Sequence, residues 1–199
     1  MARRTIQFLP ENYYHIYNRG NNQQEIFLED ENYRHFLKRL VHYYNIASIE
    51  VVAFCLMPNH YHLLITLVRE INFSNIMRSF TTSYVKSFNG WHKRVGHFFQ
   101  GDFQARQIDS TEYLMQVCRY IHRNPVKAGL TAFPEEWMFS DYRRWIGLEM
   151  KVKIHTPCKS SEFLQLRNSF IGTANDYRKF VTEYVEDSQM QEKLKTMLF

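Results

Sequence analysis

The spacing of apolar positions along the chain switches between the periods of strands and helices. The segment 13–20 is rich in strand-forming residues and ends in a Gly/Asn cluster, and the segment 29–44 has apolar residues at helical spacing. Two apolar runs, 49–56 and 60–67, predict strands. Because only residues 57–59 separate them, we expect these two strands to form a hairpin.

The pattern continues in the same way further along the chain. A helix is predicted from 73 to about 88, ended by the Asn-Gly pair at 89–90, and a short strand follows at 103–108. A third helix is predicted over about 109–122. We expect the Asn-Pro pair at 124–125 to close it, because proline disfavours helical geometry in the residue before it. This order of elements predicts an α+β fold, a ferredoxin-like antiparallel sheet flanked by helices.

The character of the sequence changes after Trp145. Helical patterns recur around 177–185 and 190–198, separated from the preceding elements by a tract with proline and serine. We therefore expect two parts, a domain at 1–150 and a C-terminal helical extension at 151–199.

Charge is concentrated in one part of the chain. The 199 residues are 45% hydrophobic and 23% charged, which favours a packed core over disorder. Between Ile76 and Leu130 there are eight lysines and arginines against three acidic residues, so this stretch accounts for the whole formal net charge of +5. A basic stretch with interleaved aromatic residues is typical of proteins that bind a phosphate backbone, although a solvated basic face looks the same.

The cysteines and the N-terminus exclude several classes of protein. Cys55, Cys118 and Cys158 are widely spaced and form no C-x-x-C pair, so neither a zinc knuckle nor a disulfide scaffold is indicated. No apolar segment follows the first residues, and no run approaches the length of a membrane span. We expect a cytoplasmic protein with no membrane partner.

Two histidines on the predicted strand 60–67 are the first candidates for chemistry. Residues two apart on a strand point to the same face, so the imidazoles of His60 and His62 can approach one metal ion together. An H-x-H pattern also occurs on strands for ordinary packing reasons.

Two tyrosines on the third predicted helix are candidate nucleophiles. Tyr113 and Tyr120 are seven residues apart and share a face, so helix geometry does not choose between them. Asn124 lies one turn after Tyr120, and its amide oxygen could complete a metal site. Val117 holds the same place relative to Tyr113 and cannot bind a metal, which favours Tyr120.

Four segments in order resemble one known family. The segment F-C-L-M-P-N-H-Y-H-L-L at 54–64 resembles the metal-binding strand of the single-tyrosine HUH transposases of insertion sequences. The segment Y-I-H-R-N-P-V-K-A-G-L at 120–130 resembles the tyrosine helix of their relatives, the REP-associated tyrosine transposases. The segments at 14–20 and 96–101 resemble flanking blocks of that second group. The resemblance spans roughly Tyr13 to Trp145.

The resemblance implies an HUH nuclease core that cleaves and rejoins single-stranded DNA through a 5′-phosphotyrosine. His60 and His62 match the histidine ligands of a divalent metal, Mg²⁺ or Mn²⁺, and Tyr120 matches the nucleophile. Asn124 matches the polar third ligand, which is a glutamine in insertion-sequence members. The implied partner is single-stranded or hairpin-forming repeat DNA, and a monomer and a homodimer both remain open.

The chain departs from the family pattern at two positions, and several residues are candidates for DNA contact. Tyr61 is bulkier than the usual aliphatic residue between the histidines, and Asp102 stands where a basic residue is expected. Aromatic side chains that could stack on unpaired bases are Trp91, Phe98 and Phe99. The basic candidates for phosphate contact are Lys93, Arg94, Arg106, Arg119, Arg123 and Lys127.

Two other functions remain open from the sequence. A ferredoxin-like sheet with aromatic residues can bind single-stranded DNA or RNA without chemistry, so the chain could be a non-catalytic regulator derived from a transposase. A histidine-metal hydrolase would need more ligands, and no H-E-x-x-H is present. The joint presence of His60, His62, Tyr120 and Asn124 favours the nuclease, because a binder needs none of them.

Overall fold

A four-stranded antiparallel sheet forms the centre of the molecule. The computed structural model describes residues 6–150 and 162–183. The strands are β1 (Tyr13–Arg19), β2 (Ile49–Met57), β3 (His60–Leu67) and β4 (Gln104–Ile108). Their order in the sheet is β2-β3-β1-β4, and every neighbouring pair is antiparallel. The predicted α+β fold and the β2–β3 hairpin are confirmed.

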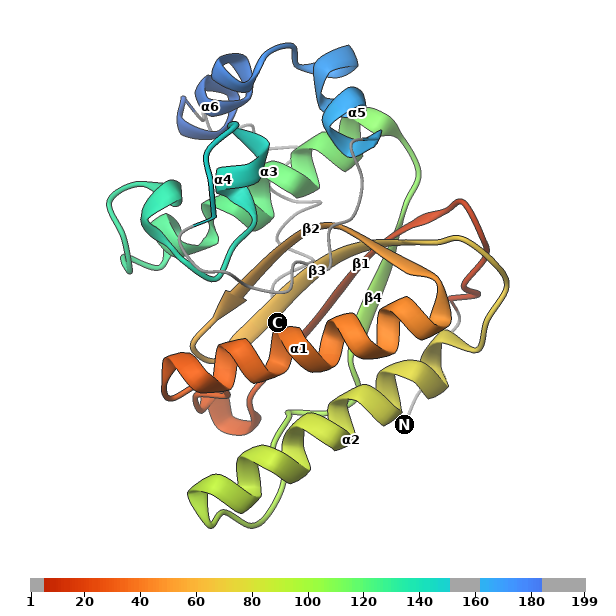
Figure 1. The fold of residues 1–199 in the computed structure, drawn as a ribbon, viewed down its shortest axis with the longest axis vertical. Coiled ribbons are helices and arrows are strands. Elements are labelled where there is room, and N and C mark those ends of the chain that lie inside the picture. The colour runs from red at the N-terminus through yellow and green to blue at the C-terminus, as the bar shows by residue number, and fades with distance from the viewer. Residues whose placement is uncertain (1–5, 151–161, 184–199) are drawn as a thin grey trace.

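Helices cover both faces of the sheet (Figure 1). On one face lie α1 (Asp30–Ala47) and α2 (Phe73–His92). On the other lies α3 (Thr111–Lys127), surrounded by α4 (Tyr142–Trp145), α5 (Glu162–Phe170) and α6 (Ala174–Thr182). Two short 3₁₀ turns occupy Asn21–Gln23 and Pro134–Glu136. No helix among the described residues is long and apolar enough to cross a membrane.

The alternation of side chains along each strand divides the core in two. Tyr14, Ile16 and Leu63 point to the face covered by α1 and α2 and belong to the larger apolar cluster. Leu64 and Cys55 point to the opposite face and pack with α3 in a second cluster. The sheet therefore presents one purely structural face and one face that also carries the histidines of β3.

Helix α2 does not end where the sequence predicts. It continues through Asn89 and Gly90 to His92, and ends when Lys93 adopts a left-handed conformation with φ of 47°. The N–H groups of Lys93 and Arg94 then donate to the carbonyl of Asn89. A glycine inside a helix costs only about 1 kcal/mol, which the burial of neighbouring Phe88 offsets.

Helix α3 also runs further than predicted, with Pro125 inside its last turn. Asn124 and Pro125 are both buried, and the N–H of Leu130 donates to the Pro125 carbonyl at 2.9 Å. Proline this close to a helix end removes one hydrogen bond and leaves only two residues to continue. Asn124 consequently stays helical, which fixes its position one turn after Tyr120.

The described part of the C-terminal extension, α5 and α6, packs against the outer side of α3. Phe163 of α5 and Tyr177 and Val181 of α6 share the second apolar cluster with Val117 and Ile121 of α3. The helical pattern at 177–185 corresponds to α6, whereas α5 was not predicted. The pattern at 190–198 lies outside the described residues.

A buried polar network ties α3 to the rest of the fold. The two ring nitrogens of His122 lie 2.8 Å from the Tyr177 hydroxyl and 3.1 Å from Asp141 Oδ1. Asp141 also accepts from the Phe54 N–H of β2 at 2.7 Å and from Trp145 Nε1 at 2.9 Å. The network links α3 to β2, α4 and α6, and each of the polar groups named here has a hydrogen-bond partner, which fixes the position of α3 relative to the sheet.

Candidate active site

His60 and His62 project from β3 towards α3. Their ring centroids are 5.0 Å apart, with the rings nearly perpendicular. The period-two spacing that predicted a shared face is therefore reproduced in the structure. His62 is fully buried, and His60 is partly buried at the end of the strand.

Tyr120 faces these histidines from the inner side of α3. Its ring centroid is 5.3 Å from that of His62, with an edge-to-face angle of 75°. The side chain is only 8% exposed, and its hydroxyl lies buried beside Asn124 without a well-formed hydrogen bond to any described residue. Burial raises the pKa of Tyr120 above the ordinary value of 10, which the Asn124 side chain partly offsets.

Asn124 joins the tyrosine to the histidines. Its amide Nδ2 donates to the backbone carbonyl of Tyr120 at 2.9 Å, which fixes the side chain against the helix. The amide oxygen is not used by this bond. The Asn124 side chain also hydrogen-bonds to His60, and this interaction opposes the lowering of the His60 pKa. The amide thus lies between the phenol and the imidazole, as a third ligand would.

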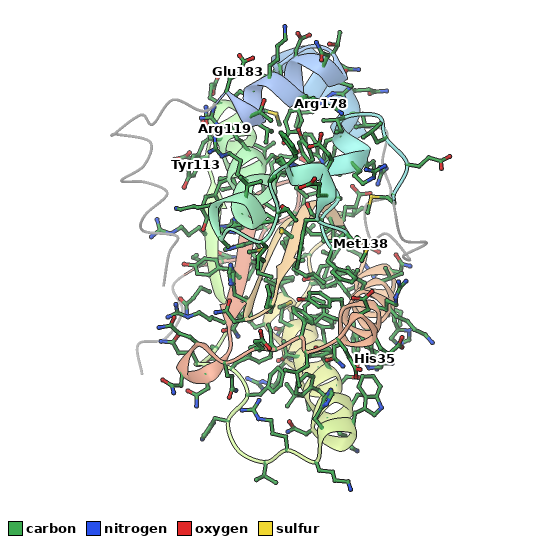
Figure 2. All side chains as sticks on the ribbon, turned by 90° about the vertical axis from the view of Figure 1, so that its left-hand side faces the viewer. His35, Tyr113, Arg119, Met138, Arg178 and Glu183 are labelled. Atoms are coloured by element: carbon green, nitrogen blue, oxygen red, sulfur yellow. The ribbon has the colours of Figure 1, made fainter. Side chains whose placement is uncertain are left out.

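Tyr113 lies elsewhere on α3. It is in the first turn of the helix, and seven residues at about 1.5 Å per residue separate it from Tyr120 by roughly 10 Å along the axis. The titratable groups that act on Tyr113 are Arg106, Asp109 and, more weakly, Tyr17. Figure 2 shows Tyr113 towards the outside of the molecule, whereas the Tyr120 ring contacts those of His62 and His15.

The donor atoms of this cluster fit a divalent metal. Nδ1 of His60 is bound to Asn59 Oδ1 at 2.6 Å, and Nδ1 of His62 to His15 Nε2 at 3.0 Å. Nε2 of His62 is buried with no hydrogen-bond partner among the described residues. Among residues 6–150 and 162–183, no group of three His, Cys, Asp or Glu side chains has the arrangement of a metal site. The donors here are two imidazoles and one amide oxygen, an incomplete set that leaves positions for a substrate oxygen and water.

Burial keeps the two imidazoles neutral at pH 7. It lowers the pKa of His60 to about 4, and nearby Arg19 acts in the same direction. Burial likewise lowers the pKa of His62 well below 6.5, assisted by His60 and His15. Metal ligation requires a neutral imidazole, so both side chains have the required charge without a change of pH.

A fall in pH from about 7.5 to about 5 is expected to lower the free energy of unfolding by about 2 kcal/mol through His15 alone. Burial lowers the pKa of His15 to about 3 in the folded chain, whereas an unfolded imidazole binds its proton near 6.5. The unfolded state therefore binds more protons between these values, and stability falls as the pH drops through 6.5. Urea denaturation in EDTA at both pH values measures the effect, and His15→Leu should show a shallower pH dependence.

The six basic residues predicted to contact DNA lie in different surroundings. Arg106 of β4 pairs in register with His15 and so lies on the same face of the sheet as the histidines. Lys127 is at the end of α3. Lys93 and Arg94 lie just after α2, where Arg94 hydrogen-bonds to Gln24.

Arg119 and Arg123 contact the extension. The Arg119 guanidinium lies 4.3 Å from the centre of the Phe180 ring, where α3 meets α6 (Figure 2). The two arginines donate to the carbonyls of Phe180 and Val181 at 3.4 and 3.3 Å. Cations near the last carbonyls of a helix stabilise it, so both side chains have a structural role beside the predicted DNA contact.

Of the aromatic residues predicted to stack on bases, one is unavailable. Phe98 is 4% exposed and packs in the core against Phe88, so its predicted stacking role is wrong. The alternation of apolar and polar residues in this loop is too irregular to show which ring turns inward. Trp91 is 48% exposed and keeps that option.

Three residues of β1 reach the site without having been predicted there. His15, Tyr17 and Arg19 alternate along β1 and share the face of His60 and His62. Arg19 pairs in register with His60, and its Nε and Nη2 donate to Gln100 Oε1 at 3.2 and 3.1 Å. The alternation is visible in the sequence. The sequence does not show that β1 pairs with β3, because the two residues in contact, His15 and His62, are 47 positions apart.

Comparisons with known proteins show the family to which this chain is similar. The sequence model of one family, described as "Transposase IS200 like", matches residues 9–124, more than half of the chain. A putative REP-associated tyrosine transposase of Haemophilus influenzae is 28% identical over 111 residues, which are 51% of this chain and 63% of that protein.

A solved structure has a similar fold. It is described as a REP-associated tyrosine transposase bound to a REP hairpin, and it superposes with a TM-score of 0.63 at 19% identity, over 81% of this chain and 96% of its own. The matched family region ends at Asn124 and therefore contains His60, His62 and Tyr120.

Proposed function

Because the chain belongs to the IS200-like transposase family, we propose that it cleaves and rejoins single-stranded DNA through a covalent bond to Tyr120. The observation that carries this proposal is the contact between the Tyr120 ring and His62, whose buried Nε2 has no hydrogen-bond partner in the described part of the chain. A phenol beside an incomplete set of metal donors is the arrangement that phosphoryl transfer to tyrosine needs.

His60, His62 and Asn124 would hold the divalent metal, Mg²⁺ or Mn²⁺, which when bound supplies Lewis-acid stabilisation of a non-bridging phosphate oxygen. The Tyr120 oxygen attacks phosphorus and loses its proton to solvent. The bond from phosphorus to the 3′ oxygen breaks, and that oxygen takes up a proton. The products are a 5′-phosphotyrosine and a 3′-hydroxyl, so another 3′-hydroxyl can reverse the step and join strands without a nucleotide cofactor.

The position of Tyr120 limits the substrate. Its side chain lies between α3 and the sheet and is 8% exposed, so the phosphate must enter a narrow space. An unpaired strand can bend into such a space, whereas an intact duplex is too wide and stiff. The related structure with a bound REP hairpin supports hairpin-forming repeats as the substrate class.

Replacing Arg19 by Ala is expected to reduce cleavage about tenfold and to leave Mn²⁺ affinity nearly unchanged. The Arg19 guanidinium lies beside His60 and is oriented by Gln100, where it can donate to a phosphate oxygen. Initial rates at saturating Mn²⁺ measure the loss. Arg34→Ala on α1 is the control, since Arg34 pairs with Asp30 on the far side of the sheet. Equal rates for Arg19→Ala and wild type would contradict this role.

The proposed function is tested by incubating the wild-type chain with 5′-labelled and 3′-labelled hairpin oligonucleotides and Mn²⁺. We expect a protein–DNA product that survives denaturing electrophoresis and carries the 3′ label only, since the tyrosine retains the 5′ phosphate. Mass spectrometry of the digested product should place the nucleotide on the peptide containing Tyr120. Binding of the hairpins with no covalent product would support the non-catalytic regulator instead.

A further inference from the structure

A third histidine contacts the candidate metal site from β1. Nε2 of His15 lies 3.0 Å from Nδ1 of His62, and the two rings are stacked with their centroids 5.1 Å apart. Both side chains are fully buried. A hydrogen bond between two buried neutral imidazoles requires one nitrogen to donate and the other to accept, so this contact determines where His62 carries its proton.

The two directions of this hydrogen bond have different consequences. If His15 donates, His62 carries its own proton on Nε2, a buried atom with no hydrogen-bond partner among the described residues. If His62 donates, the same holds for the proton on Nδ1 of His15, so the requirement of a metal for a free lone pair distinguishes the two directions. If His62 donates from Nδ1, its Nε2 keeps a free lone pair. His62 can bind a metal through Nε2 only when it donates from Nδ1 to His15. A bound metal therefore stabilises this direction of the hydrogen bond, and this direction in turn favours metal binding.

Packing and strand pairing fix the position of the His15 ring beside His62. Its ring stacks on Tyr17 with centroids 5.0 Å apart and meets the edge of Tyr120 at 6.1 Å, so packing restricts its rotation. Its backbone is paired on both sides, with Leu64 of β3 and Arg106 of β4. His15 is therefore held in one orientation, with Nε2 directed at Nδ1 of His62.

We propose that His15 is a positioning residue that accepts the Nδ1 proton of His62 and so keeps Nε2 of His62 free for the divalent metal. This inference rests on the proposed function, because it assigns His62 as a ligand. Groups that orient a metal-binding histidine in this way typically contribute 10–100-fold to metal affinity.

The test compares three substitutions of His15 and one control in a Mn²⁺ titration without DNA, in which electron paramagnetic resonance measures the free ion. His15→Leu keeps the volume and removes the acceptor, and should weaken Mn²⁺ binding about 10–100-fold. The amide of Gln extends about as far as imidazole Nε2, so His15→Gln should restore most of the affinity. The shorter His15→Asn should not restore it. His42→Leu, at an exposed position of α1, should bind as wild type does.

Thermal melts of each variant separate loss of the fold from loss of the site. If His15→Leu fails to fold, the difference between the Gln and Asn variants still decides, since both place a polar amide in the same cavity. Equal affinity of His15→Leu or His15→Asn and the wild type would overturn the role of His15 while leaving the metal site in place. A wild-type chain that binds no Mn²⁺ would instead remove the metal from the proposed function, and this inference with it.

Discussion

Tyr120→Phe is expected to abolish the covalent protein–DNA product, with a loss of more than about 1,000-fold in cleavage rate. Removing a nucleophile leaves only the groups that bind and polarise the phosphate, and these cannot form the intermediate. The Tyr120 hydroxyl is buried without a well-formed hydrogen bond, so its removal should not destabilise the fold. Single-turnover cleavage of a labelled hairpin gives the rate, and a thermal melt checks the fold.

The matched control is Tyr113→Phe, which makes the same chemical change in the first turn of the same helix. We expect this variant to form the covalent product at nearly the wild-type rate. Loss of the product in Tyr113→Phe and its survival in Tyr120→Phe would move the nucleophile to the other end of α3. Survival in both variants would show that neither phenol is the attacking group.

His62→Ala is expected to reduce cleavage by more than about 100-fold, because losing a ligand costs more than losing a group that merely orients one. The variant should still bind a hairpin oligonucleotide, since phosphate contacts from basic side chains supply most of that affinity. Gel-shift and cleavage assays on the same preparation separate the two effects. EDTA should reduce the wild type to the level of the variant.

A histidine outside the site provides the comparison for His62. His97 is exposed in the loop between α2 and β4, and His97→Ala should cleave as wild type does. Cleavage by the wild type that is insensitive to EDTA would contradict the role of the metal, even if His62→Ala were inactive. Equal loss of binding and cleavage in His62→Ala would indicate damage to the fold.

Local sequence rules predict the parts of the site that belong to one element. His60 and His62 share a face because strands have a period of two, and Asn124 follows Tyr120 by one helical turn. Each relation lies within a few residues of sequence. That β3 and α3 lie close to each other was expected from the resemblance to the family, and in the structure the two elements do lie together.

The contributions from distant elements could not be predicted in this way. His15 reaches His62 only because β1 lies between β3 and β4, and one sequence does not show strand order. The contact of Arg119 with the Phe180 ring depends on where α6 packs, which the basic stretch of α3 does not indicate. The prediction that the Asn-Pro pair at 124–125 closes the third helix was wrong for another reason. The local preference against helix was real, but burial of Asn124 and Pro125 outweighed it.

The packing of α5 and α6 on the outer side of α3 has a consequence for how many copies of the chain a cut requires. Swinging α3 out to serve a second molecule would uncover Val117 and Ile121 and break the His122–Tyr177 contact. Helix α3 is thus packed against α5 and α6 on one side, while Tyr120 on its other side contacts His62 of the same chain. One copy of the chain brings Tyr120, His60, His62 and Asn124 together, so the cleavage that we propose would need no side chain from a second copy.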